Sequence, residues 1–302
     1  MNKEHHNIST LINAFHQLRI LFIHLRLHFQ VLLAPIFLWG FLLAGGEATT
    51  RFVWAFIALH LFLYGGTTAF NSYYDQDRGP VGGLEHPPPV TQALLPFSLI
   101  MQGIGFLLAM FVNLPFLIIY LFTFLVATAY SHPMTRLKRH PWISLFVVAI
   151  GQGGVIALAG WLTARPDLRG LTLLAWWGIL ASTLTIAGIY PVTQIYQIEE
   201  DLAREDITFA ARVGPQRALW FAVTLQALGA TLMVWLIYQM YGVAQSILVA
   251  FVYGGTLLSL LNWSYTFDAT AIIDNYRRVM HITFVTSLGF MGFLILHILG
   301  LL

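Results

Sequence analysis

Apolar stretches of about 20 residues, the length that a helix needs to cross a bilayer, follow one another along nearly the whole chain. Of the 302 residues, 58% are hydrophobic and 9% are charged. So little polar side chain cannot cover the surface of a water-soluble domain of this length. The sequence therefore predicts an all-α integral membrane protein with nine transmembrane helices, at residues 28–46, 52–72, 93–113, 114–131, 142–162, 171–192, 217–240, 243–264 and 279–301.

The basic residues are distributed unequally between alternate connections of these spans. If the N-terminus is cytoplasmic, 12 of the 15 lysines and arginines lie on the inside, and Arg51, Arg165 and Arg169 lie outside. An excess of basic residues in cytoplasmic segments is what normally sets the orientation of a membrane protein. We therefore expect the N-terminus in the cytoplasm, the C-terminus outside, and the prokaryotic inner membrane as the location.

The first 25 residues lack the pattern of a cleaved signal sequence. Apolar residues recur there at helical spacing, which is typical of an amphipathic helix lying on the membrane surface. These residues are Leu11, Ile12, Phe15, Leu18 and Phe22. The chain contains no cysteine, which excludes disulfides, thiolate metal sites and cysteine nucleophiles.

Two short segments, residues 71–77 and 197–206, concentrate the acidic side chains. Together with Glu85 they hold eight of the 13 acidic residues, and both lie in long connections on the same side of the membrane. Each segment begins with a carboxamide four residues before an aspartate, so the two side chains share one face of a helical turn. The pairs are Asn71 with Asp75 and Gln197 with Asp201.

Carboxylates and amide oxygens at the ends of two facing helices are suitable ligands for Mg²⁺, which also binds substrate phosphates. A metal ion of this kind stabilises a diphosphate as a leaving group. The simpler interpretation is that the carboxylates cap helices and solubilise loops, and the related spacing of two clusters argues against it. A transporter would also place acids in the membrane, but these acids lie at the ends of spans. An electron carrier would require paired histidines, and no such pair is evident.

Three segments together resemble the UbiA superfamily of intramembrane prenyltransferases. Residues 71–77 resemble its Asn-Asp-x-x-Asp-x-x-x-Asp motif, and residues 197–214 resemble an Asp-x-x-x-Asp pattern followed by a Thr and a Gly. Residues 130–138 are similar to a Tyr-Ser-x-Pro-x-x-Arg/Lys-Leu-Lys segment of the chlorophyll synthase-like branch. The matching positions are Asn71, Asp75, Asp201, Thr208, Gly214, Tyr130, Ser131, Pro133, Arg136, Leu137 and Lys138.

The chain also departs from these motifs. Ser72 and Gly79 stand where the first motif has aspartates, and Asp77 comes two residues before the last of them. Gln197 stands where the second motif begins with an aspartate. Substitute carboxylates are available nearby, in Asp77, Glu199, Glu200 and Asp206.

The resemblance implies one UbiA-like domain over residues 1–302, with the nine helices arranged around a central cavity that opens to the cytoplasm and to lipid. It implies Mg²⁺-dependent transfer of a prenyl group from a polyprenyl diphosphate to an aromatic or lipid-like acceptor. Catalytic roles fall to Asp75, Asp201 and Tyr130. Diphosphate binding falls to Asn71, Arg136, Lys138, Gln197 and Arg204. Metal binding falls to Asp75, Asp77, Glu199, Glu200 and Asp201.

The resemblance implies a lipid bilayer, a prenyl diphosphate and a hydrophobic acceptor as partners, with no nucleic acid and no obligatory protein partner. The altered motifs leave open a terpene cyclisation, and a non-enzymatic transporter remains the alternative outside this chemistry. Arg26, just before the first span, could face the cavity, although anchoring at the membrane edge is the simpler interpretation. Gln152, within residues 151–154, could contact an acceptor, although glycine-mediated packing explains that segment.

Overall fold

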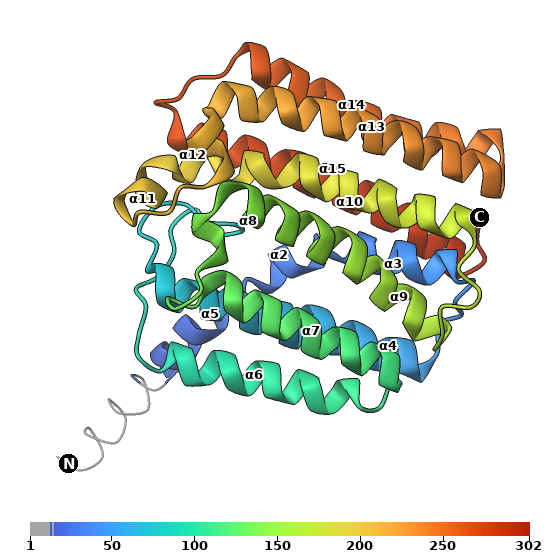
Figure 1. The fold of residues 1–302 in the computed structure, drawn as a ribbon, viewed down its shortest axis with the longest axis horizontal. Helices are drawn as coiled ribbons and strands as arrows, with labels where there is room; N and C mark the ends of the chain where they lie inside the picture. The colour runs from blue at the N-terminus through green and yellow to red at the C-terminus, as the bar shows by residue number, and fades with distance from the viewer. Residues whose placement is uncertain (1–12, 14) are drawn as a thin grey trace, which may run out of the picture.

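The computed structural model describes residue 13 and residues 15–302, and Figure 1 shows long helices running side by side in one bundle. Within these residues the one β pairing is an isolated bridge between Val81 and Leu84. The elements in chain order are α2 (Leu27–Val31), α3 (Ala34–Leu43), α4 (Thr50–Phe56), η1 (Ile57–Tyr64), α5 (Gly65–Asp75), α6 (Leu94–Ala109), α7 (Leu114–Ser131), η2 (Leu137–Arg139), α8 (Pro141–Val148), η3 (Ala149–Val155), α9 (Ile156–Ala164), α10 (Leu173–Thr193), η4 (Ile195–Gln197), α11 (Ile198–Ala203), α12 (Phe209–Val213), α13 (Pro215–Tyr241), α14 (Val243–Tyr265) and α15 (Ile272–Ile298).

The all-helical membrane architecture is confirmed, and the number of spans is partly confirmed. Within the described residues, seven continuous helical segments are long and apolar enough to cross a membrane, and they begin at Thr50, Leu114, Pro141, Leu173, Pro215, Val243 and Ile272. An eighth span exists if the helix over residues 15–31 and α3, which meet at a 44° bend, are counted together. The remaining expected span, residues 93–113, coincides with α6, which has only 16 residues. Nine spans and the side of the membrane that each end faces remain predictions.

The first expected span, residues 28–46, is interrupted. α2 forms its first residues and ends at Val31, residues 32–33 are not helical, and α3 then has Pro35 in its first turn. Proline lacks a backbone N–H and clashes with the preceding turn, so it is tolerated at a helix start and not in a helix interior. Phe15, Leu18 and Phe22 are exposed on the helix before α2, while Leu11 and Ile12 lie outside the described residues.

Two glycines allow α3 and α9 to pack with their backbones almost in contact. A Cβ atom on Gly40 would lie 1.8 Å from the carbonyl oxygen of Ala157, and one on Gly160 would lie 2.0 Å from that of Phe37. Either methyl group would force the helices apart. This close approach fixes the centre of the bundle, where Trp39 is fully buried and donates a 3.0 Å hydrogen bond to the carbonyl of Gly178.

Two transmembrane segments contain π-helical turns. η1 lies between α4 and α5, and η3 lies between α8 and α9. A π-helical turn leaves the backbone wider than an α-helix and is frequent at functional sites. Tyr64 at the end of η1, and Gly151 and Gln152 within η3, line the same internal cavity.

The two long connections meet at one end of the bundle. In Figure 1, α11, α12 and the loop that follows α5 lie at the left, whereas the C-terminus lies at the opposite end. The segment Leu173–Ala203 is nearly continuous through α10, η4 and α11, so the second acidic cluster is carried by a helical end. Both acidic clusters therefore reach the same end of the bundle.

Candidate active site

A cavity of about 320 Å³ extends from this end into the bundle. Its charged lining comprises three acids and three bases, namely Asp75, Asp77, Asp201, Arg26, Lys138 and Arg204. The deeper wall is largely apolar and includes Leu33, Tyr64, Val126, Val148, Ile186 and Ile189. A polar mouth and an apolar interior suit a ligand with a charged head and a hydrocarbon tail.

Asp75, the last residue of α5, is the centre of the first polar cluster. Lys138 Nζ donates a hydrogen bond to Asp75 Oδ1 and lies 3.3 Å from Asn71 Oδ1. Ser131 Oγ donates to the same Asn71 oxygen at 2.7 Å. Asn71 and Asp75 share one face of α5, as the four-residue spacing predicts. The structure thus brings the first and third motif segments into direct contact.

Arg136 lies behind Asp75 and does not line the cavity. Its Nε and Nη2 atoms donate two parallel hydrogen bonds, each of 2.7 Å, to the two carboxylate oxygens of Asp206. Its Nη2 atom is also 3.4 Å from Asp75 Oδ1. The hydrogen bonds that Arg136 donates to Asp206 raise the pKa of Arg136 above its ordinary value, against the opposing effect of burial. Asp206 is completely buried, so this candidate substitute metal ligand is instead the counter-ion of Arg136.

Arg204 joins the two acidic clusters. Its Nη1 atom donates to Asp77 Oδ1 at 2.8 Å and to the backbone carbonyl of Asp75 at 3.0 Å. Its Nη2 atom donates to Asp201 Oδ1 at 2.9 Å. Burial lowers the pKa of Arg204, but the adjacent Asp77 and Asp75 raise it by more, so the net direction is upward. Arg204 therefore stays charged between the two carboxylates.

Asp77 is held in an environment that disfavours its charge. Burial raises its pKa, and the neighbouring Asp75 adds to this effect, while Arg204 and Arg26 oppose it. Its Oδ2 atom is buried and has no hydrogen-bond partner among the described residues. A buried acceptor without a partner is costly and marks a position where a ligand or ion can bind.

Two of the expected metal ligands lie outside the cavity lining. Glu199 is exposed. The carboxylate of Glu200 accepts hydrogen bonds from the backbone N–H groups of Arg78 at 2.7 Å and Gly79 at 3.3 Å. A Cβ on Gly79 would lie 3.1 Å from Glu200 Oε2. The carboxylate of Glu200 thus occupies the space beside the position where the family motif has its last aspartate.

The remaining expected residues lie in the cavity wall. The hydroxyl groups of Tyr130 and Tyr190 are 2.6 Å apart, and both tyrosines line the cavity. Gln197 and Gln152 line it as well. The structure therefore places Tyr130 and Gln197 at the cavity, although it does not test the roles expected of them.

Arg26 belongs to the cavity, contrary to the simpler interpretation that it anchors the membrane edge. It has a left-handed backbone conformation with φ 51°, and only 5% of its surface is exposed. Its Nη2 atom donates to Ser72 Oγ at 2.6 Å. The available signal in the sequence is an arginine directly before an apolar span, because a charge buried in a membrane protein is expensive unless it has a function.

The carboxylates form a partial ligand set for a divalent cation. Within the described residues, Asp75 and Asp201 each accept hydrogen bonds from basic side chains through Oδ1 alone, and Asp77 Oδ2 has no hydrogen-bond partner. No group of three His, Cys, Asp or Glu side chains in the described chain is arranged to hold a metal ion alone. Mg²⁺ typically uses one or two carboxylates and fills its octahedron with waters and substrate phosphates. The donor set therefore fits Mg²⁺ that binds together with a diphosphate.

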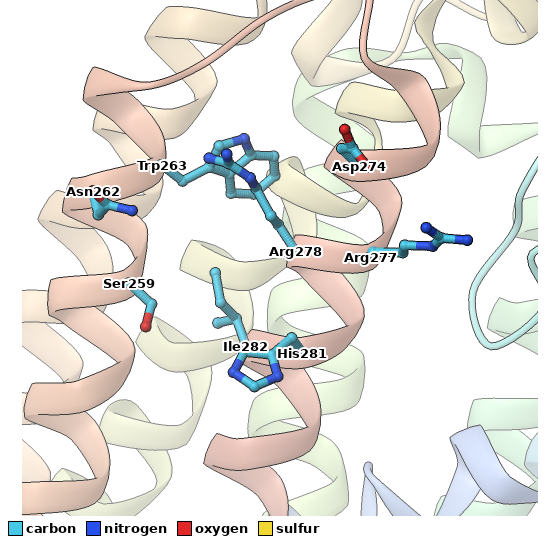
Figure 2. Close-up of a pocket in the computed structure, with 8 residues that line it drawn as sticks. All are labelled: Ser259, Asn262, Trp263, Asp274, Arg277, Arg278, His281 and Ile282. Carbon is cyan, nitrogen blue, oxygen red and sulfur yellow. The ribbon is translucent and has the colours of Figure 1, made fainter.

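A second pocket, of about 410 Å³, lies between α14 and α15 (Figure 2). Figure 2 shows Arg277 pointing away from Arg278. Arg277 forms two hydrogen bonds with Glu85, and Arg278 donates one to Thr266. Asp274 is the one acid in its lining, so this pocket does not reproduce the paired acids and bases of the first cavity.

Comparison with known proteins identifies the class to which this fold and cavity belong. Residues 33–285 match the UbiA prenyltransferase family, and the chain belongs to that family. A search of curated proteins finds no match.

Solved structures share the fold at low sequence identity. A digeranylgeranylglyceryl phosphate synthase structure has 18% identity and a TM-score of 0.62, covering 93% of this chain and 99% of that one. A UbiA homologue from Archaeoglobus fulgidus bound to GPP and Mg²⁺ has 16% identity and a TM-score of 0.62, with coverage of 91% and 99%. An apo UbiA homologue from Aeropyrum pernix K1 has 20% identity and a TM-score of 0.63, with coverage of 87% and 97%.

Proposed function

We propose that this chain transfers a prenyl group from an allylic polyprenyl diphosphate to an aromatic or lipid-like acceptor, with Mg²⁺ as cofactor. The observation that carries the proposal is the convergence of Asp75, Asp201 and Lys138 at the mouth of a cavity whose interior is apolar. The Archaeoglobus fulgidus homologue, bound to GPP and Mg²⁺, supports a ligand of this class.

The polar mouth would bind the diphosphate. Lys138 supplies a compact charge, and Arg26 lines the same cavity, with its buried Nε atom unpaired among the described residues. Asn71 and Gln197 would orient the phosphate oxygens through their amide groups. Asp75, Asp77 and Asp201 would hold Mg²⁺, which neutralises charge on the leaving diphosphate. Arg136 would act one layer back, by fixing the position of Asp75.

In the reaction, the bond between the allylic carbon and the diphosphate oxygen breaks, and its electron pair leaves with the diphosphate. An electron pair of the acceptor forms the new bond to that carbon, and the acceptor loses a proton. The chain's contribution is to orient the allylic carbon and exclude water, because water would intercept the cationic carbon. Tyr130, Tyr190, Val148 and Ile186 line the cavity and would contribute to this shielding.

The test is product analysis with the purified protein in lipid. The protein is incubated with Mg²⁺, a series of allylic diphosphates and extracted membrane lipids, and products are identified by mass spectrometry. Asp75→Asn and Asp201→Asn should each lower turnover by about 10²–10³-fold, because each removes a charge from the leaving-group site. The matched control is Asp167→Asn, in the loop between α9 and α10, where the carboxylate only caps a turn.

The products distinguish this proposal from its alternatives. A prenylated acceptor with released pyrophosphate supports transfer, whereas a cyclic hydrocarbon with released pyrophosphate indicates terpene cyclisation. Movement of ions or solutes across sealed vesicles without pyrophosphate release would indicate a transporter. Full activity in either aspartate variant would refute the assigned site.

The side of the membrane that the cavity faces is also testable. We propose that it faces the cytoplasm of a prokaryotic cell, and the absence of native cysteine allows single cysteines to be introduced without background labelling. Arg212→Cys at the cavity end should be protected from an impermeant maleimide in intact spheroplasts, whereas Asp167→Cys should react. The reverse pattern would invert the orientation.

A further inference from the structure

Arg204 occupies the position where a cation would bridge the two acidic clusters. Divalent ions in phosphate-transfer sites commonly bridge carboxylates that come from different elements. Here Asp77 and Asp201 come from the ends of two different helical segments, and one guanidinium contacts an oxygen of each, at 2.8 and 2.9 Å. The same guanidinium donates at 3.0 Å to the carbonyl of Asp75, at the negative C-terminal end of α5.

The fold holds the Arg204 side chain in place, so this side chain is not a flexible group on the surface. Arg204 ends α11, and its backbone N–H donates to the carbonyl of Asp201 at 3.0 Å. Glu205 follows in a left-handed conformation with φ 60°, which reverses the chain at this point. Only 18% of the Arg204 side chain is exposed. The guanidinium is therefore held in place by the turn, the burial and its hydrogen bonds.

Two of the aspartates that the family motifs have near this position are replaced by uncharged residues. Gly79 and Gln197 stand at two positions where the family motifs have aspartates, and a side chain at position 79 would meet the carboxylate of Glu200. The charged cavity lining already balances three acids against three bases. A divalent ion placed between Asp77 and Asp201 would face the guanidinium at contact distance, where the repulsion is strong because the site is buried.

We propose that Arg204 replaces one divalent cation, so that this chain binds each diphosphate together with a single Mg²⁺. This inference rests on the proposed function, because it assumes that the cavity binds a diphosphate. Arg204 serves as a permanent bridge between the clusters, and the remaining ion would be held by Asp75 and Asp201 through their Oδ2 atoms, which accept no hydrogen bond from the described residues.

The inference is tested by counting metal ions without any turnover. The protein in nanodiscs is dialysed against inorganic pyrophosphate and Mn²⁺, and the excess of manganese and phosphorus over a protein-free chamber is measured by mass spectrometry. We expect about one Mn²⁺ per bound pyrophosphate in the wild type, because a diphosphate completes the coordination of an ion held by one or two carboxylates. A wild-type ratio of about two, the stoichiometry of a two-metal site, would overturn the inference.

Variants of Arg204 provide the matched comparison. Arg204→Gln should raise the ratio to about two, since it frees Asp77 and Asp201 to bridge a second ion. Arg204→Lys retains the charge and should leave the ratio unchanged, as should Arg212→Gln on the exposed face of α12. A ratio that stays at about one in Arg204→Gln would show that Arg204 does not occupy a metal position.

The outcomes remain decisive if Arg204→Gln does not fold, because the wild-type ratio alone can refute the inference. They also separate the inference from the proposed function. Pyrophosphate binding with the wrong metal ratio refutes only the replacement of a cation. Failure of the wild type to bind pyrophosphate at any Mn²⁺ concentration would refute the diphosphate site itself, and the inference with it.

Discussion

Replacing Asp206 by asparagine should destabilise the protein through Arg136. The substitution preserves the size of a completely buried side chain and removes its charge, so Arg136 loses a two-pronged ion pair made of two 2.7 Å hydrogen bonds. Removing one partner of a buried pair typically costs 3–5 kcal/mol, because the other charge is left uncompensated. Arg136 keeps a weaker contact with Asp75 at 3.4 Å, which places the expected cost at the lower end, about 3 kcal/mol.

The measurement is the midpoint of thermal unfolding in a defined detergent. For a chain of this size about 3 kcal/mol corresponds to a fall of roughly 5 °C in Tm. Arg136→Gln alone should show a similar fall, and the double variant should lose less than the sum, with a coupling of about 2 kcal/mol. Glu47→Gln, an exposed acid, is the control and should change Tm by less than about 2 °C. A Tm for Asp206→Asn within about 3 °C of the wild type, or strictly additive single effects, would refute the reasoning.

Three further perturbations probe the cavity and its loop. Lys138→Gln should weaken pyrophosphate binding about tenfold in isothermal titration, as expected for the loss of one charge-assisted hydrogen bond, and an unchanged affinity would remove it from the site. Gly151→Leu should exclude the longest prenyl donors first, because Gly151 lines the cavity and has open space beyond its Cα. Gly103→Leu, on an exposed face of α6, is the control. An equal loss of activity with donors of all lengths would contradict this prediction. Glu85→Gln should accelerate amide exchange in residues 76–90, because it removes the link to Arg277. The hydrogen bond from Arg277 lowers the pKa of Glu85, so the link contributes above the ordinary pKa of Glu85 and is lost as pH falls through the lowered value. If neither the variant nor low pH changes amide exchange in residues 76–90, this contact does not order the loop.

The sequence predicts those features of the fold and site that depend on short residue spacing and on the polarity of whole segments. Asn71 and Asp75 share a helical face because four residues make about one turn, and the structure retains this relation. The proximity of the two acidic segments followed from placing both at the same ends of apolar spans. The motif predicts that Lys138 binds the diphosphate, which stays a prediction, and the structure places its ammonium group in contact with Asp75.

What the sequence could not predict depends on which charged partners meet in three dimensions. Asp206 and Arg136 are 70 residues apart, and nothing in their local patterns indicates that they pair. Glu200 looked like a metal ligand by its position in an acidic run, yet its carboxylate binds backbone N–H groups about 120 residues away, at Arg78 and Gly79. A linear motif cannot indicate which of several neighbouring acids turns inward.

The helical structure that follows the sixth span is not predicted by the sequence. The expected span, residues 171–192, agrees with α10, which ends at Thr193. In the structure Pro191 lies inside α10, and short helical turns carry the chain on to Ala203. The second acidic cluster therefore belongs to a nearly continuous helical segment, which positions Asp201 more firmly than a loop would.

The pairing of every cavity acid with a base has a consequence for binding. Asp75 contacts Lys138, and Asp77 and Asp201 contact Arg204, so the diphosphate-binding groups are already engaged with one another. A diphosphate that enters alone competes with these carboxylates for the same bases, and it brings more negative charge into a buried site. Mg²⁺ that enters alone meets carboxylates whose Oδ1 atoms are occupied. When both enter together, the cation takes the carboxylates as the phosphates take Lys138, so each ligand removes the obstacle to the other. We therefore expect diphosphate and Mg²⁺ to bind with strong positive cooperativity, each raising the affinity for the other by the same factor.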